Sequence, residues 1–116
     1  MMTSFNEYQD WTETTAIYTD PAYPQLALAE EVGEFLGKLA KFKRDVAGRG
    51  MPPEEYIVHA EKLRADVTKE AGDILWQLAR VLKDLDIPMQ DAVDVNVAKL
   101  ESRKERNVLN GSGDDR

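Results

Sequence analysis

The chain has 116 residues, a formal net charge of −7, no cysteine and 42% hydrophobic residues. One domain of this length buries roughly two-thirds of its unfolded surface, so a single chain has enough material for a core. The missing cysteines exclude a disulfide framework, the acidic balance argues against binding to polynucleotides, and no apolar run is long enough to span a membrane. With no signal peptide in view, the expected location is the cytoplasm.

Helical periodicity predicts four helices and no strand, because helix-forming residues dominate and no segment alternates apolar with polar residues. Ser4 is the expected N-cap of the first helix, with Glu7 at the third helical position as in a capping box. Proline and glycine residues mark the breaks between the later helices. The expected helices span about residues 4–18, 24–47, 53–86 and 87–106, with a break near the middle of the third left open. The predicted class is all-α.

The second predicted helix carries an acidic cluster beside its apolar stripe. Glu31 and Glu34 are three residues apart and therefore share a face, and Glu30 lies four residues before Glu34. Gly33 lies within this cluster, although a glycine inside a helix costs about 1 kcal/mol relative to alanine. Close approach of another helix, or room for a ligand, would justify that cost.

The third predicted helix repeats the arrangement. Glu70 and Asp73 are three residues apart beside its apolar stripe, with Gly72 between them. If the two acidic faces oppose each other, four or five carboxylates converge, and like charges that close raise one another's pKa and repel. A divalent cation relieves this, and oxygen ligands without histidine or cysteine favour Mg²⁺, Mn²⁺ or Ca²⁺ over Zn²⁺. Each cluster taken alone also fits a solvated acidic helix face.

The two clusters read E-E-x-x-E followed, one helix later, by E-x-x-D, and this pattern resembles the signature of the MazG-like all-α nucleoside triphosphate pyrophosphohydrolases. These enzymes are related to the dimeric dUTPases and to the small dCTP pyrophosphatases. The resemblance extends to the opening Phe5–Gln9, to the N-x-x-K-L-x-x-R segment Asn96–Arg103 and to the glycine-rich ending. The interval between Glu34 and Glu70 is longer than is usual in the family.

The resemblance implies a four-helix-bundle-like MazG-type domain over residues 1–106 and a glycine-rich tail over residues 107–116. It also implies a homodimer or homotetramer that completes the site. The expected metal ligands are Glu31, Glu34, Glu70 and Asp73, with Mg²⁺ as the cofactor and Mn²⁺ as the alternative. We assign Glu30 as the general base that takes the proton from the attacking water. A fifth ligand, a hydrogen-bond partner of a ligand and a solvated side chain are the other roles left open for it.

Substrate contacts are expected from the last and the first helix. Lys99 and Arg103 lie one turn apart and are assigned to the phosphates, while Asn96 on the same face is assigned to the substrate or to a metal-bound water. The alternative is a solvated basic helix end, which the helix dipole favours. For the base, Gln9 is the candidate for reading its edge and Trp11 for stacking, although aromatic residues at helical spacing also fit a core.

Two readings of the tail stay open at this point. Its backbone N–H groups and Arg116 are placed to close over phosphates, and an equally simple alternative is a disordered terminus.

The predicted function is Mg²⁺-dependent hydrolysis of a (deoxy)nucleoside triphosphate to the monophosphate and pyrophosphate. Hydrolysis of a guanosine polyphosphate alarmone and a non-catalytic helical binding module are the alternatives. A carboxylate-bridged di-iron bundle would need Glu-x-x-His motifs on two helices, which the single His59 does not supply. The preferred base, the sugar and the number of metal ions stay open.

Overall fold

The computed structural model describes residue 2 and residues 4–116, and within them it is helical without any strand. The elements are α1 (Phe5–Thr12), a short 3₁₀ helix η1 (Glu13–Thr15), α2 (Ala22–Asp45), α3 (Pro53–Asp84) and α4 (Met89–Glu105). The all-α class is therefore confirmed. None of the described helices combines the length and the apolar character needed to cross a membrane.

The ends of the helices follow local side-chain chemistry. The Ser4 hydroxyl accepts a hydrogen bond from the backbone N–H of Glu7 at 3.1 Å, which confirms it as the N-cap of α1. The prediction that this helix continues to residue 18 was wrong, because α1 ends at Thr12 and continues only as the 3₁₀ turn. Hydroxyls of three threonines there donate back to carbonyls three residues earlier, a pattern that competes with helix continuation.

The long interval between the two acidic clusters lengthens a helical hairpin. α2 and α3 run antiparallel and are joined by a turn in which Gly48 and Gly50 adopt φ of +76° and +69°, a region that favours glycine. Pro53 begins α3, where its missing N–H costs nothing. No break occurs in the middle of α3, which is continuous over 32 residues.

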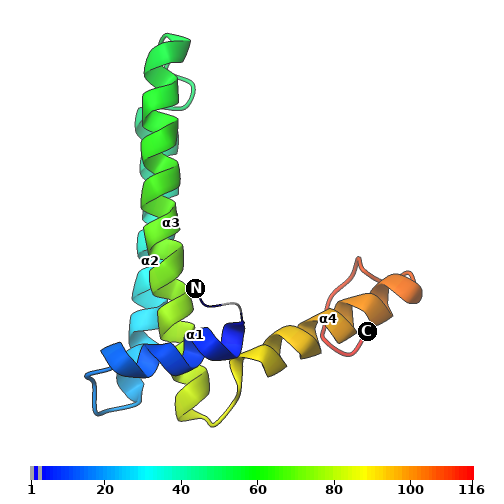
Figure 1. The fold of residues 1–116 in the computed structure, drawn as a ribbon. Coiled ribbons are helices and arrows are strands. Elements are labelled where there is room, and N and C mark those ends of the chain that lie inside the picture. Colours follow the sequence, from blue (N-terminus) through cyan, green and yellow to red (C-terminus); the bar gives the residue numbers. More distant parts are fainter. Residues whose placement is uncertain (1, 3) are drawn as a thin grey trace.

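The remaining helices gather at one end of the hairpin, which we call the base (Figure 1). α1 crosses the base and contacts α3 and α4, whereas α2 contacts only α3 among the helices. α4 leaves the base sideways and points away from the hairpin (Figure 1). The radius of gyration is 18.3 Å, whereas a compact domain of this length has about 13 Å. A closed four-helix bundle is therefore not formed within one chain.

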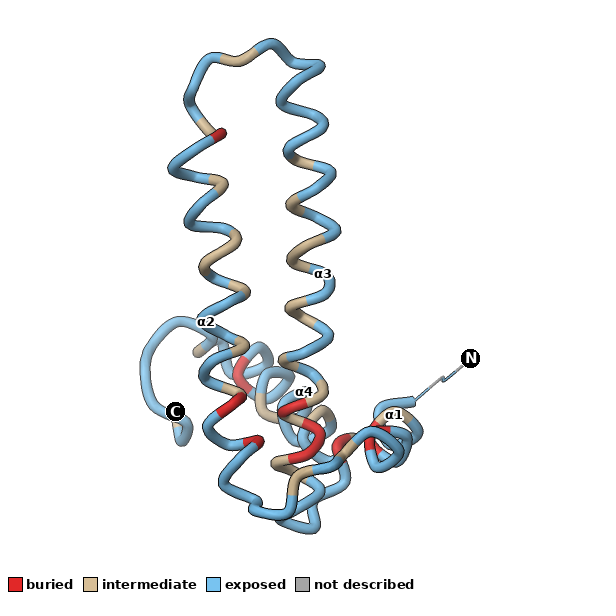
Figure 2. The backbone as a smooth tube through the Cα atoms, turned by 90° about the vertical axis from the view of Figure 1, so that its left-hand side faces the viewer, coloured by how far each residue is buried: buried red, intermediate tan, exposed pale blue. Residues whose placement is uncertain are grey.

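The core is correspondingly small. The buried hydrophobic residues of the described chain are Ala27, Val46, Ala79 and Met89. Figure 2 shows that buried positions concentrate at the base, while both arms of the hairpin are mostly exposed or half-buried. Large apolar side chains stay exposed on α2 and α4, for example Leu26 at 75% and Val95 at 68%.

Buried polar groups hold the base together. Gln9 is 3% exposed, and its side-chain amide donates to the carbonyls of Ala79 at 3.3 Å and Ile87 at 2.9 Å. Its side-chain oxygen accepts the N–H of Met89 at 2.9 Å. One amide group thus ties α1 to α3 and to the first residue of α4.

Arg80 makes a second polar connection at the base. It is 4% exposed, and its guanidinium donates to Glu13 Oε2 at 2.7 Å and to the Tyr18 hydroxyl at 2.9 Å. These bonds fix the segment that follows α1 against α3. Hydrogen bonds to charged groups of this kind contribute more than neutral ones.

We expect Gln9→Ala to lower the free energy of unfolding by about 2–4 kcal/mol, because it removes three hydrogen bonds made by a side chain that is only 3% exposed. Urea unfolding measured by circular dichroism checks this. Gln25→Ala is the matched control, since Gln25 is exposed on α2 and should change stability by less than about 0.5 kcal/mol. Equal effects of the two substitutions would contradict the role assigned to Gln9.

Candidate functional site

The packing of α2 against α3 brings acidic side chains of the two helices together. Glu31, Glu34 and Glu70 each offer a carboxylate oxygen, and these oxygens all lie within 4.8 Å of one another. Glu31 and Glu70 are half-buried, whereas Glu34 is exposed. Three of the four residues predicted as metal ligands thus form one group, which we call the carboxylate cluster.

Burial and neighbouring negative charges raise the pKa values of two carboxylates in the cluster. Burial raises the pKa of Glu31, and the charge of Asp73 raises it further. Burial also raises the pKa of Glu70, followed by the charge of Glu34. Asp73, the fourth predicted ligand, is exposed on α3 and lies close enough to act on Glu31.

Two oxygens of the cluster are buried without a hydrogen-bond partner in the described chain. They are Oε2 of Glu31 and Oε2 of Glu70. A buried carboxylate oxygen without a donor is costly, and a hard divalent cation supplies the charge that it lacks. The donor set is oxygen only, so these residues fit Mg²⁺ or Mn²⁺.

A groove of about 530 Å³ opens beside the cluster. Glu30, the predicted general base, lines it together with Glu34 and Glu70. Lys38 and Lys41 line the same groove, and sequence reasoning did not single them out. Their signal in the sequence is weak, because lysines at helical spacing after an acidic residue usually mark a solvated face.

The glycines of the two clusters are not needed for contact between α2 and α3. A Cβ added at Gly33 or at Gly72 would meet no heavy atom within 4 Å. Of the two reasons expected for these glycines, close approach of helices does not hold within one chain. Gly33 and Gly72 instead leave open space beside the carboxylates.

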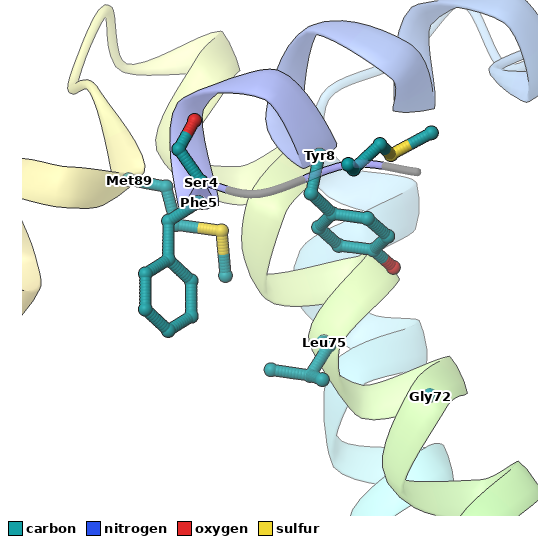
Figure 3. Close-up of a pocket in the computed structure, with 7 residues that line it drawn as sticks. Ser4, Phe5, Tyr8, Gly72, Leu75 and Met89 are labelled. Atoms are coloured by element: carbon teal, nitrogen blue, oxygen red, sulfur yellow. The ribbon is translucent and has the colours of Figure 1, made fainter.

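An apolar pocket of about 410 Å³ lies beside α1 (Figure 3). Phe5 and Tyr8 of α1, Leu75 of α3 and Met89 of α4 line it, and Gly72 connects it to the acidic segment of α3. Burial raises the pKa of the Tyr8 hydroxyl, and the charge of Asp73 raises it further, so this pocket lies next to a predicted ligand.

The two residues of α1 that were predicted to contact the base, Gln9 and Trp11, do not line this pocket. Trp11 is 43% exposed and stacks on the Tyr8 ring, with centroids 6.1 Å apart. Gln9 has its amide engaged with the backbone at the base, so the structure gives it a packing role and leaves no free edge to read a base. The sequence could not reveal this, because the carbonyls that Gln9 binds lie at least 70 residues away.

The predicted substrate residues of α4 divide into two sets. Asn96 lines a cavity of about 280 Å³ that shares Phe5, Leu75 and Met89 with the apolar pocket. Lys99 and Arg103 lie further along α4, where they contact Asp114 of the tail. α4 makes no contact with α2 and points away from the hairpin (Figure 1), so one chain does not bring these two cations to the carboxylate cluster.

Comparison with known proteins shows which family the chain resembles. A family model described as the MazG nucleotide pyrophosphohydrolase domain matches residues 22–108, a range that includes both acidic clusters. The chain is also 33% identical over 118 residues to the gene 37 protein of Mycobacterium phage L5, which covers 94% of this chain and 96% of that protein. No solved structure matches significantly.

Proposed function

Because the chain belongs to the MazG nucleotide pyrophosphohydrolase family, we propose that it hydrolyses nucleoside triphosphates, deoxynucleotides in particular, to monophosphate and pyrophosphate with Mg²⁺. The observation that carries the proposal is the carboxylate cluster with its two buried, unpartnered oxygens. A solvated acidic face would leave both oxygens in water.

The proposed roles follow from position. Glu31, Glu34, Glu70 and Asp73 would hold the cation. When bound, such a cation neutralises charge on the phosphoryl group and acidifies a water molecule. Glu30 lines the groove beside the cluster, and its exposed carboxylate is our candidate for taking the proton of the attacking water.

The same groove offers positive charge for the phosphates. Lys38 and Lys41 follow Glu34 by one and two turns of α2 and line the groove with it. A triphosphate carries more negative charge than one divalent cation neutralises, so nearby ammonium groups would favour its binding. We therefore add these two lysines to the proposed phosphate contacts.

We assign the nucleobase to the apolar pocket. Its volume lies in the range of small-molecule sites, and its aromatic lining is suited to stacking on a base. The pocket also touches the segment between two proposed ligands, Glu70 and Asp73, through Gly72. A nucleotide bound at the cluster would therefore reach it with its base.

This assignment predicts the effect of Tyr8→Ala. Loss of one stacking side chain should raise KM about 5- to 150-fold, because base stacking on an aromatic ring contributes about 1–3 kcal/mol. The rise in melting temperature with Mg²⁺ should persist. Tyr56→Ala is the matched control, since Tyr56 lies on α3 near the far end of the hairpin. An unchanged KM in Tyr8→Ala would contradict the assignment of the base to this pocket.

We further propose that the working form is a homodimer or homotetramer. The small core and the exposed apolar side chains of α2 and α4 support this. So does the separation of Lys99 and Arg103 from the carboxylate cluster of the same chain, because a second copy would bring its α4 to that cluster.

Product analysis tests the reaction. Purified protein is incubated with each common ribonucleoside and deoxynucleoside triphosphate and with guanosine polyphosphate, in Mg²⁺ or EDTA, and products are separated by ion exchange. We expect monophosphate and pyrophosphate with Mg²⁺ only, lost in Glu34→Gln and Asp73→Asn. Turnover of the alarmone alone would move the proposal to that substrate, and no turnover by a folded protein would favour a binding module.

A further inference from the structure

The C-terminal tail, residues 107–116, is a folded loop that returns onto the last turns of α4 (Figure 1). Arg116 donates to the carbonyls of Val108 at 3.2 Å, Leu109 at 3.0 Å and Gly113 at 2.5 Å. In turn, the Arg106 guanidinium donates to the Arg116 carbonyl oxygen at 2.7 Å. The Arg116 guanidinium, expected as one way of closing over phosphates, is therefore committed to the loop itself.

The loop places a carboxylate on the two cations assigned to the phosphates. Asp114 Oδ1 lies 3.4 Å from Lys99 Nζ and 3.6 Å from Arg103 Nη2. Both distances exceed the 2.7–2.9 Å or so of a tight charge-assisted hydrogen bond. The Asp114 side chain is 85% exposed, so water reaches the pair and weakens it.

Arg103 is the buried half of this contact. Its side chain is 6% exposed, and its Nε has no hydrogen-bond partner in the described part of the chain. Its Nη2 donates to the carbonyls of Gly113 at 3.2 Å and Asp114 at 2.9 Å. A buried guanidinium with a free donor is costly, and an anion with several oxygens would satisfy it better than one loosely held carboxylate.

We propose that Asp114 is a displaceable internal ligand, which occupies the Lys99–Arg103 pair until a phosphate group takes its place, so that the tail acts as a self-inhibitory latch. Assigning that phosphate to a nucleotide rests on the proposed function, whereas displacement by phosphate itself does not. Lys99 and Arg103 hold the pKa of Asp114 below its usual range. A phosphate carries more charge and more acceptor oxygens than a carboxylate, and therefore competes for the same pair.

Binding of inorganic pyrophosphate in EDTA isolates the latch from the metal and from turnover. Isothermal titration at low salt compares the wild type with Asp114→Asn and Asp115→Asn. Asp115 is the matched control, because it carries the same charge one residue along and makes no ion pair or hydrogen bond within the described chain. We expect Asp114→Asn to bind about three- to tenfold more tightly and Asp115→Asn to change less than twofold.

A second comparison tests the cations. Adding Lys99→Gln to Asp114→Asn should cancel the gain in affinity, because the freed pair is then broken. Weaker binding in Asp114→Asn would mean that Asp114 orients the cations and would overturn the latch. Equal changes in Asp114→Asn and Asp115→Asn, or no measurable pyrophosphate binding in any variant, would overturn it as well.

Nucleotide turnover separates this inference from the proposed function. If the latch acts on the substrate, Asp114→Asn should lower KM for the triphosphate about three- to tenfold with kcat little changed. A gain in pyrophosphate affinity without any turnover would retain the latch and reject the reaction. Turnover with unchanged KM and unchanged pyrophosphate affinity would reject the latch and retain the reaction.

Discussion

Glu31→Gln is expected to raise the melting temperature of the metal-free protein by roughly 2–5 °C and to abolish both the stabilisation by Mg²⁺ and at least about 99% of turnover. The gain in stability without metal and the loss of the Mg²⁺ response have the same cause, which is the negative charge of Glu31. Without a cation, the Glu31 charge is half-buried and faces the like charges of Asp73 and Glu34, so removing it relieves repulsion. With a cation, the same substitution removes a ligand.

Differential scanning fluorimetry with a Mg²⁺ titration, and then with EDTA, measures the stability part. For the wild type, saturation to about 100 times the dissociation constant corresponds to about 2.7 kcal/mol of stabilisation. Glu61→Gln is the control, because Glu61 is exposed on α3 away from the cluster and should keep the Mg²⁺ response. A Glu31→Gln protein that is less stable in EDTA, yet is still stabilised by Mg²⁺, would argue against a metal at this position.

The acidic site shows what spacing can predict. Residues three apart on one helix must share a face, so Glu31 with Glu34, and Glu70 with Asp73, follow from the sequence alone. The register of α2 against α3 cannot be predicted from spacing, because it depends on the turn and on packing along the whole hairpin. The structure supplies that register, and it brings Glu70 to the pair on α2, while Asp73 lies outside the three converging carboxylates but acts on Glu31 through its charge.

The missed features depend on contacts distant in the chain or on competing local bonds. Gln9 looks like any polar residue on an amphipathic helix until the backbone carbonyls of Ala79 and Ile87 are placed beside it. The early end of α1 follows from threonine hydroxyls such as that of Thr12, whose bonds to the preceding turn carry no strong sequence signal. The all-α class was predictable from composition, whereas the end of α1 and the hydrogen bonds of Gln9 were not.

If the chain forms the proposed assembly of two or four copies, Val97→Asp is expected to reduce it to the monomer of 13.1 kDa. Val93, Val97 and Leu100 recur at helical spacing on α4, and Val97 is 52% exposed within one chain. An isolated helix of this length is marginal in water, so α4 needs a partner for its apolar face beyond its contacts at the base. A carboxylate placed in that interface would be buried without a partner, which costs several kcal/mol.

Sedimentation velocity over a range of concentrations measures the assembly, and Ala98→Asp is the matched control. Ala98 lies on the face of α4 that already carries Asp94, so the same new charge there should leave the assembly intact. If the α4 of a second copy completes the site, Val97→Asp should also lose turnover even though each chain keeps its carboxylate cluster and Lys99. A wild type that is monomeric at every concentration and fully active would contradict both parts, because the site would then have to be complete within one chain.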